Sequence, residues 1–94
     1  MLMTDGALVS LVRPHPDYPA IALQRQLEGW VLVEFDVLAN GMVANIEVIE
    51  SSDPVFERSA RRATAKFRFK PRVVDGVAVA TSDVRNLIRY RMED

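Results

Sequence analysis

The sequence predicts an α+β domain in which a three-stranded antiparallel sheet packs on two helices. Three observations indicate this fold class. Residues 29–38 and 43–49 alternate between apolar and polar side chains, as strands with one buried face do. Residues 54–69 repeat apolar side chains at helical spacing, and residues 84–92 alternate again. A chain of 94 residues is long enough to form one small domain with its own core.

The composition excludes several classes of protein. The chain is 49% hydrophobic and 27% charged, which argues against global disorder. No run approaches the ~20 apolar residues that a membrane-spanning helix needs. There is no cysteine, so the sequence carries neither a disulfide nor a thiolate metal site. The net charge of −1 gives no general attraction to nucleic acid.

The first residues lack the marks of a targeting signal. Residues 1–12 contain a short apolar stretch but no basic leader and no cleavage pattern. We therefore expect residues 1–11 to be the remnant of a linker or a terminal extension, and residues 12–94 to be the domain.

A proline-rich segment precedes the first predicted helix. Three prolines fall within residues 13–19, and proline fixes φ and restricts the residue before it. We expect this segment to be extended and stiff. A short helix follows from Pro19 to Leu27, with Ala20, Ala22, Leu23 and Leu27 available to face inward, and Gly29 suits its end.

A hairpin joins the first two predicted strands. Asn40-Gly41 supplies the residues that most readily adopt positive φ, so a two-residue loop is expected there. This register sets three apolar pairs on one face of the hairpin. The pairs are Val37 with Ala44, Phe35 with Ile46, and Val33 with Val48.

The second helix has a clear start signal. Asp53 can cap it, and Pro54 fits its first position. Phe56, Ala60, Ala63 and Phe67 form the expected buried stripe. The helix should end near Phe69, because Pro71 disfavours helical geometry at the residue before it. Asp75-Gly76 then marks a turn.

The third strand is expected over Val84 to Met92 and should lie beside the first. The connection through a helix favours the strand order 2-1-3, in which every neighbouring pair is antiparallel. Charge supports this order, because Glu34 and Asp36 would face arginines of the third strand. Those arginines are Arg85, Arg89 and Arg91. The third strand then becomes an edge whose backbone N–H and C=O groups are open to an incoming peptide.

The sequence contains no convincing pattern of catalytic or metal-binding residues. His15 is the only histidine, and the sequence places no nucleophile or further ligand around it. Glu34 and Asp36 could form a carboxylate pair ~7 Å apart, but an arginine-paired sheet face explains them better. We predict no enzymatic activity, no cofactor and no metal site.

Seven cationic residues between residues 58 and 72 raise the alternative of a nucleic-acid binder. Phe67 belongs to the buried stripe, which removes it as a stacking platform. A solvated helix face is therefore the favoured interpretation of this basic run. The run comprises Arg58, Arg61, Arg62, Lys66, Arg68, Lys70 and Arg72.

Short motifs in a fixed order resemble a known family, the C-terminal domain of TonB. The resemblance covers Val12 to Met92. It departs at Phe67, where the family commonly has tryptophan, and at His15, where some relatives carry glutamine. The motifs are Tyr18-Pro19, Leu27-Glu28-Gly29, Phe35-Asp36-Val37, Asn40-Gly41-Met42-Val43 and Phe67-Arg68-Phe69-Lys70-Pro71.

The resemblance implies the periplasmic binding domain of an energy transducer. Such a domain captures the TonB-box peptide of an outer-membrane transporter by strand addition to its last strand. The resemblance also implies an inner-membrane anchor outside this chain that works with ExbB and ExbD on the proton-motive force. By position, the implied partner-binding residues are Arg13, His15, Asp17, Tyr18, Pro19, Val84, Arg85, Asn86, Leu87, Ile88, Arg89, Tyr90, Arg91 and Met92.

Two alternatives remain at this point. A TolA-like or other periplasmic adaptor could use the same fold for a different partner, and the basic helix could bind nucleic acid. An exposed edge strand also favours a homodimer formed by strand exchange.

Overall fold

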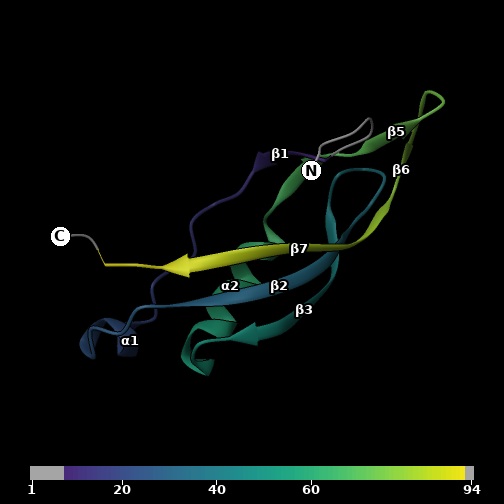
Figure 1. The fold of residues 1–94 in the computed structure, drawn as a ribbon. Helices are drawn as coiled ribbons and strands as arrows, with labels where there is room; N and C mark the ends of the chain where they lie inside the picture. The colour runs from purple at the N-terminus through teal and green to yellow at the C-terminus, as the bar shows by residue number, and fades with distance from the viewer. Residues whose placement is uncertain (1–7, 93–94) are drawn as a thin grey trace.

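A computed structural model describes residues 8–92 of the protein. Helix α1 precedes the β2–β3 hairpin, and helix α2 separates this hairpin from the last four strands (Figure 1). The elements are β1 (Val9–Val12), α1 (Ala20–Gln24), β2 (Gly29–Val37), β3 (Val43–Ser51), the 3₁₀ turn η1 (Pro54–Phe56), α2 (Glu57–Ala65), β4 (Arg68–Lys70), β5 (Arg72–Val74), β6 (Val77–Val79) and β7 (Thr81–Tyr90).

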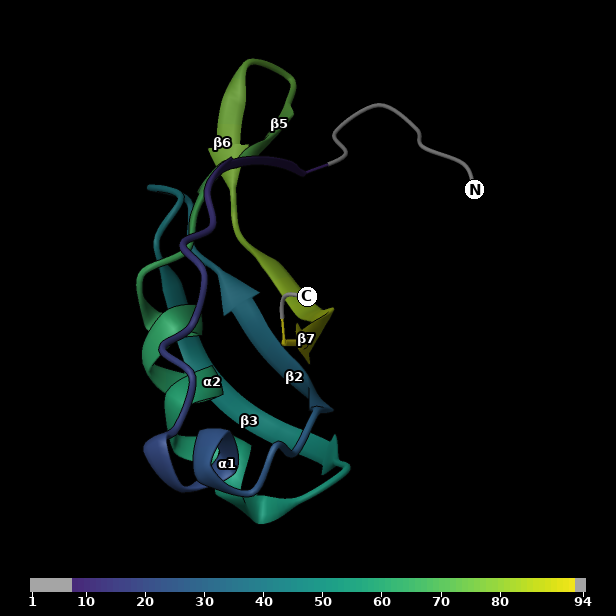
Figure 2. The ribbon, with the colours of Figure 1, turned by 90° about the vertical axis from the view of Figure 1, so that its left-hand side faces the viewer.

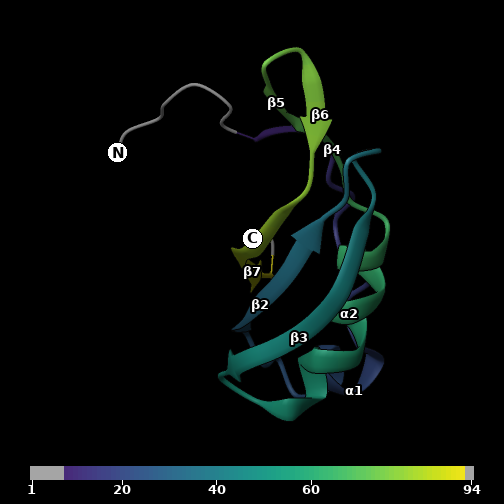
Figure 3. The same ribbon diagram turned by 90° about the vertical axis from the view of Figure 1, so that its right-hand side faces the viewer.

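The main sheet has the strand order β3-β2-β7, and both strand pairs are antiparallel. Because these strands are the predicted second, first and third, the predicted order 2-1-3 is confirmed. Both helices lie on the same face of this sheet, and no element among residues 8–92 covers the opposite face (Figures 2 and 3). The predicted α+β class is therefore confirmed.

The core lies between β2 and α2. Val31, Val33, Phe35 and Val37 of β2 are almost completely buried, as the alternation in the sequence predicts. The predicted helix stripe is buried as well. Its members are Phe56, Ala60, Ala63 and Phe67.

The second helix ends earlier than expected. It stops at Ala65 rather than near Phe69, because the N–H groups of Lys66 and Phe67 turn back to carbonyls one turn earlier, each at 3.0 Å. Arg68–Lys70 then forms β4, which pairs with β1. Phe67 and Phe69 both remain buried. Phe67, just after the helix, and Phe69, in β4, therefore both contribute aromatic rings to the core.

The first helix is also shorter than the predicted span from Pro19 to Leu27. Gln26 adopts a φ of 53°, and the N–H of Leu27 bonds the carbonyl of Ala22 at 2.9 Å. This is a Schellman ending, which terminates the helix after Gln24 without a glycine. Leu23 is 50% exposed, so its predicted inward orientation is wrong.

The hairpin turn lies where expected, but its loop has three residues instead of two. The N–H of Gly41 bonds the carbonyl of Leu38 at 2.8 Å, and only Gly41 takes positive φ at the turn. Val37 therefore lies opposite Val43, not the predicted Ala44.

A bulge in β3 then restores part of the predicted register. Asn45 has a φ of 55° and adds a residue to its strand, so the predicted pair of Phe35 with Ile46 does not form. Beyond the bulge, Val33 lies opposite Val48, as predicted.

The charges on the open face are paired differently from the prediction in one case. Arg85 lies opposite Glu34 and forms an ion pair at 2.9 Å, which confirms that cross-strand contact. Within the described residues, Asp36 forms no ion pair with an arginine. Its carboxylate accepts bonds from the Asn45 amide at 2.8 Å and the Asp83 N–H at 3.2 Å, and these bonds lower the pKa of Asp36.

Two small two-stranded sheets extend the structure, and the sequence patterns did not indicate them. β1 pairs with β4, and β5 pairs with β6 around the predicted Asp75-Gly76 turn, forming a projecting hairpin (Figure 1). Residues 9–11 of the predicted linker take part in β1, whereas residues 1–7 lie outside the described part of the chain. β7 ends at Tyr90, so Met92 follows the strand instead of closing it.

Gly41 is expected to be far less tolerant of a side chain than Gly76, although both have positive φ. A Cβ at Gly41 would lie 2.1 Å from the carbonyl oxygen of Phe69, whereas nothing lies within 4 Å of one at Gly76. We expect Gly41→Ala to lower the free energy of unfolding by at least ~1 kcal/mol more than Gly76→Ala. Urea denaturation of both variants measures this difference, and equal losses would contradict the proposed close contact.

The amide of Asn45 should set the titration of Asp36. Asn45→Gly keeps a residue that tolerates positive φ and removes the amide donor, so the pKa of Asp36 should rise toward its ordinary value. A depressed folded-state pKa stabilises the fold above pH ~3.8, and this stabilisation is lost as pH falls through the lower folded value. Carboxyl NMR titration measures the shift. An unchanged midpoint in the variant would show that another group holds the pKa down.

Candidate functional site

β7 forms an open edge of the main sheet. β2 pairs with one side of β7, and within residues 8–92 no strand pairs with the other side (Figure 3). The N-terminal strand β1 does not cover this edge, because it pairs with β4. A row of backbone donors and acceptors therefore remains available along β7.

The alternation of the ladder identifies which residues carry these vacant groups. The Trp30 carbonyl bonds Ser52 and the Leu38 N–H bonds Met42, so even-numbered residues of β2 direct their backbone groups toward β3. The backbone N–H and C=O groups of odd-numbered β2 residues therefore point toward β7. Val31, for example, lies opposite Ile88.

Residues paired in this way exchange hydrogen bonds. The N–H and C=O groups of even-numbered β7 residues are therefore bonded to β2. The Met92 N–H also points to this side, because it donates to the Glu28 carboxylate at 2.8 Å. It follows that Arg85, Leu87 and Arg89 direct their N–H and C=O groups to the open edge.

β3 is the other edge of the sheet, but its shape makes it a poor template for a guest strand. Its register against β2 shifts twice, once near Asn45 and once between Val48 and Glu50. Bulges of this kind twist an edge and interrupt regular pairing. By contrast, β7 pairs without a shift from Val84 to Tyr90.

The side chains along β7 differ on its two faces. Val84, Asn86, Ile88 and Tyr90 face the helices and are at least partly buried. On the uncovered face, Leu87 is 44% exposed and lies opposite Leu32. Together with neighbouring residues, these two leucines line a shallow cleft of about 700 Å³. The other lining residues are Glu28, Gly29, Trp30, Glu50, Arg89, Tyr90 and Arg91.

The predicted residues of the proline-rich segment reach β7 at two points. The Arg13 guanidinium donates to the Asn86 side-chain oxygen at 2.8 Å. The Tyr18 ring meets the Tyr90 ring edge to face at 5.7 Å, and its hydroxyl donates to the carbonyl of Leu27. Desolvation and the Glu28 carboxylate raise the pKa of Tyr18.

Tyr90 fastens the end of β7 to the helical layer. Its ring stacks on Phe56 with centroids 4.5 Å apart. Its hydroxyl lies 3.0 Å from the Ser59 Oγ and donates to the Phe56 carbonyl at 3.3 Å. Burial raises the pKa of Tyr90. These contacts hold the strand in place while its outer edge stays open.

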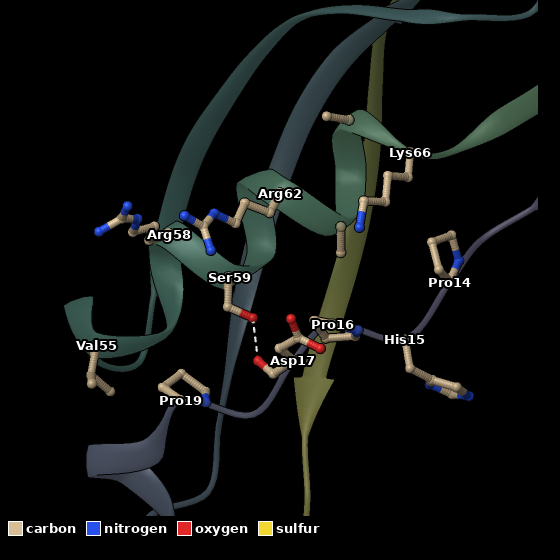
Figure 4. Close-up of a pocket in the computed structure, with 12 residues that line it drawn as sticks. Pro14, His15, Pro16, Asp17, Pro19, Val55, Arg58, Ser59, Arg62 and Lys66 are labelled. Atoms are coloured by element: carbon tan, nitrogen blue, oxygen red, sulfur yellow. Dashed lines mark hydrogen bonds between the residues drawn. The ribbon is translucent and has the colours of Figure 1, made fainter.

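The remaining predicted residues of this segment lie elsewhere. His15, Asp17 and Pro19 line a second cleft of about 800 Å³ between the proline-rich segment and α2 (Figure 4). The Ser59 hydroxyl bonds the Asp17 carbonyl and joins the two walls. The sequence indicates Arg58 and Arg62 only as part of the basic run, considered for nucleic acid and interpreted as a solvated helix face, whereas in the structure both line this cleft. Their four-residue spacing places them on one helix face.

The described part of the chain lacks two other features, a cluster of metal-ligating side chains and a helix able to span a membrane. Residues 8–92 contain no group of three His, Asp or Glu side chains placed to hold a metal ion. No helix among them is long and apolar enough to cross a membrane.

Comparison with known proteins gives a consistent result. The profile of the family described as Gram-negative bacterial TonB protein C-terminal matches residues 14–92. Protein TonB of Pseudomonas aeruginosa is 39% identical over 79 residues, which are 83% of this chain and 23% of that protein. Protein TonB of Vibrio cholerae is 34% identical over 94 residues, which are 99% of this chain and 38% of that protein. The chain therefore spans well under half the length of these curated relatives.

Solved structures agree with the sequence matches. The solution structure of the Pseudomonas aeruginosa TonB C-terminal domain superposes with a TM-score of 0.78 at 34% identity, covering 98% of this chain and 93% of that one. The TonB2 protein of Vibrio anguillarum superposes with a TM-score of 0.69 at 27% identity, covering 100% of this chain and 90% of that one.

Removing the Tyr90 hydroxyl should weaken the attachment of β7. Tyr90→Phe keeps the stacked ring and loses the bonds to Ser59 and Phe56, so we expect a loss of about 0.5–1.5 kcal/mol in the free energy of unfolding. Ser59→Ala is a partial control: it removes the Ser59 contacts with both Tyr90 and Asp17 and leaves the Tyr90 hydroxyl bonded to the Phe56 carbonyl. Urea denaturation that shows no loss in Tyr90→Phe would contradict this attachment.

Proposed function

The chain belongs to the family of the Gram-negative TonB protein C-terminal domain, and from this premise we propose that it captures a TonB-box peptide of an outer-membrane transporter. The peptide adds as a strand to the open edge of β7. The observation that carries this proposal is the vacant backbone row at Arg85, Leu87 and Arg89. The role is one of binding and force transmission, not catalysis.

Strand addition explains how one domain can hold peptides of varied sequence. Main-chain hydrogen bonds from the edge provide affinity that is independent of the guest's side chains. The guest's side chains alternate between the two sheet faces. On the uncovered face they would meet Leu87 and the cleft beside Trp30, which favours an apolar residue there.

Charge should contribute to the rate of encounter more than to affinity. Arg89 and Arg91 are exposed beside the edge, and Arg85 is 56% exposed at its side chain although it pairs with Glu34. Such cations attract acidic groups on a transporter and steer it toward the edge.

We further propose that this chain is the C-terminal part of a longer protein. In that protein, a segment outside this chain anchors the domain to the inner membrane, and the domain works in the periplasm. The anchor works with ExbB and ExbD, which draw on the proton-motive force. Pulling on the captured peptide then transmits this energy to active uptake, for example of iron-loaded siderophores.

The same edge also provides a route to self-association. A second copy of the chain could occupy the vacant row on β7, forming a homodimer by strand exchange. Such a dimer would compete with the peptide. Sedimentation measurements should therefore show less dimer as peptide is added.

Titration with a TonB-box peptide tests the proposal directly. Backbone amide shifts in an NMR titration should concentrate on residues 84–92. Shifts confined to the α2 cations on addition of DNA, with none on addition of peptide, would overturn the proposal in favour of a nucleic-acid binder. A TolA-like adaptor would show no shifts with this peptide.

Leu87→Pro should weaken peptide capture strongly, because proline removes the central N–H of the vacant row. We expect an affinity loss of about tenfold or more, measured by calorimetry. Leu87→Ala is the control, since it keeps the N–H and removes only the side chain, and its loss should be smaller. Circular dichroism verifies that both variants fold. Equal losses in the two variants would show that the side chain, not the backbone, holds the peptide.

A further inference from the structure

The cleft between α2 and the proline-rich segment is separate from the edge of β7. We propose that it binds an extended acidic polypeptide segment, with carboxylates at alternate positions, as a second contact with a protein partner. Three cationic side chains of this cleft carry the proposal. They are Arg58, Arg62 and Lys66.

The structure distinguishes these three cations from Arg61 and Arg68, and the other two cations of the basic run, Lys70 and Arg72, do not line the cleft. The Arg61 guanidinium bonds the Ile46 carbonyl at 3.1 Å, and Arg68 bonds the carbonyls of Ala65 and Phe67. Within residues 8–92, by contrast, the side chains of Arg58, Arg62 and Lys66 bond no carbonyl, and, like Arg61 and Arg68, they form no ion pair with a carboxylate. All three are exposed and line one cleft, where Asp17 is the one carboxylate among the lining residues, so an excess of positive charge is available to a ligand.

Their spacing fits an extended chain. Residues four apart on a helix lie on one face and rise by ~6 Å along its axis. Alternate side chains of an extended strand are ~6.7 Å apart and point the same way. Glutamates at alternate positions of a guest could therefore meet Arg58, Arg62 and Lys66 in order.

The opposite wall is rigid before the guest arrives. Pro14, Pro16 and Pro19 lie along it, and the Ser59 hydroxyl fixes the Asp17 carbonyl between them (Figure 4). A preformed wall lowers the entropic cost of binding. It also supplies apolar surface for the guest's intervening side chains.

Two other anionic partners fit less well. The cleft is lined by no aromatic ring on which a nucleic-acid base could stack, apart from the His15 imidazole at its end (Figure 4). A membrane surface needs a broad face with protruding apolar side chains, whereas this site is a concave cleft whose largest aliphatic lining side chain is Val55.

The test uses fluorescence anisotropy with two labelled heptapeptides of equal charge. One is Ser-Glu-Ser-Glu-Ser-Glu-Ser, and the other is Ser-Ser-Glu-Glu-Glu-Ser-Ser. The alternating peptide should bind more tightly. The triple variant Arg58→Gln, Arg62→Gln, Lys66→Gln should lose about tenfold in affinity for it, because three exposed ion pairs disappear. All three positions are exposed, and glutamine is a good helix former, so the fold should persist.

A second triple variant with the same charge change is the control. Arg25→Gln, Lys70→Gln, Arg72→Gln removes cations outside the cleft and should change affinity less than twofold. Equal losses in the two triples, equal binding of the two peptides, or no binding at all would overturn the proposal. Tighter binding of oligo-dT or of phosphatidylglycerol vesicles would also overturn it, by assigning the cleft to phosphate groups. TonB-box binding at β7 should persist in the cleft variant, so the two proposals fail independently.

Discussion

The one-sided pairing of β7 is the constraint on which the rest of this structure depends. β2 has a neighbouring strand on each side, whereas among residues 8–92 β7 has a partner on one side only. The strand can stay open because other contacts hold it. Its buried side chains pack into the core, and Tyr90 ties its end to Phe56 and Ser59. Stability and availability for binding therefore come from different groups of the same strand: the side chains fix it, and alternate backbone groups remain vacant.

The two clefts follow from the placement of both helices on one sheet face. The uncovered face leaves Leu32 and Leu87 accessible next to the edge, where a guest strand would place its side chains. On the helical side, the proline-rich segment runs back along α2 and creates the cationic cleft. A partner could thus be held by backbone pairing at one surface and by charge at another, and binding at both would raise the overall affinity through effective concentration.

The sequence predicts the fold class and strand order well because alternation and turn residues are local signals. Prediction from the sequence fails where tertiary contacts determine the local structure. The αL residue Gln26 ends the first helix without glycine, and Asn45 inserts a bulge that no periodicity reveals. The segment that forms β4 was expected to be the end of the second helix, because buried Phe67 and Phe69 are compatible with either a helix or a strand. Its pairing with the distant β1 makes it a strand. For the site, the edge could be predicted, but the vacant alternate residues depend on hydrogen-bond directions that only coordinates supply.

Amide hydrogen exchange of the free and peptide-bound domain tests the central claim most directly, because it reads each backbone N–H along β7 separately. In the free protein, the amides of Arg85, Leu87 and Arg89 should exchange quickly, while those of Asn86 and Ile88 are protected by β2. Addition of a TonB-box peptide should slow exchange at the first three and leave the other two nearly unchanged. Protection of Arg85, Leu87 and Arg89 already in the free monomer, or no gain of protection with bound peptide, would contradict the account.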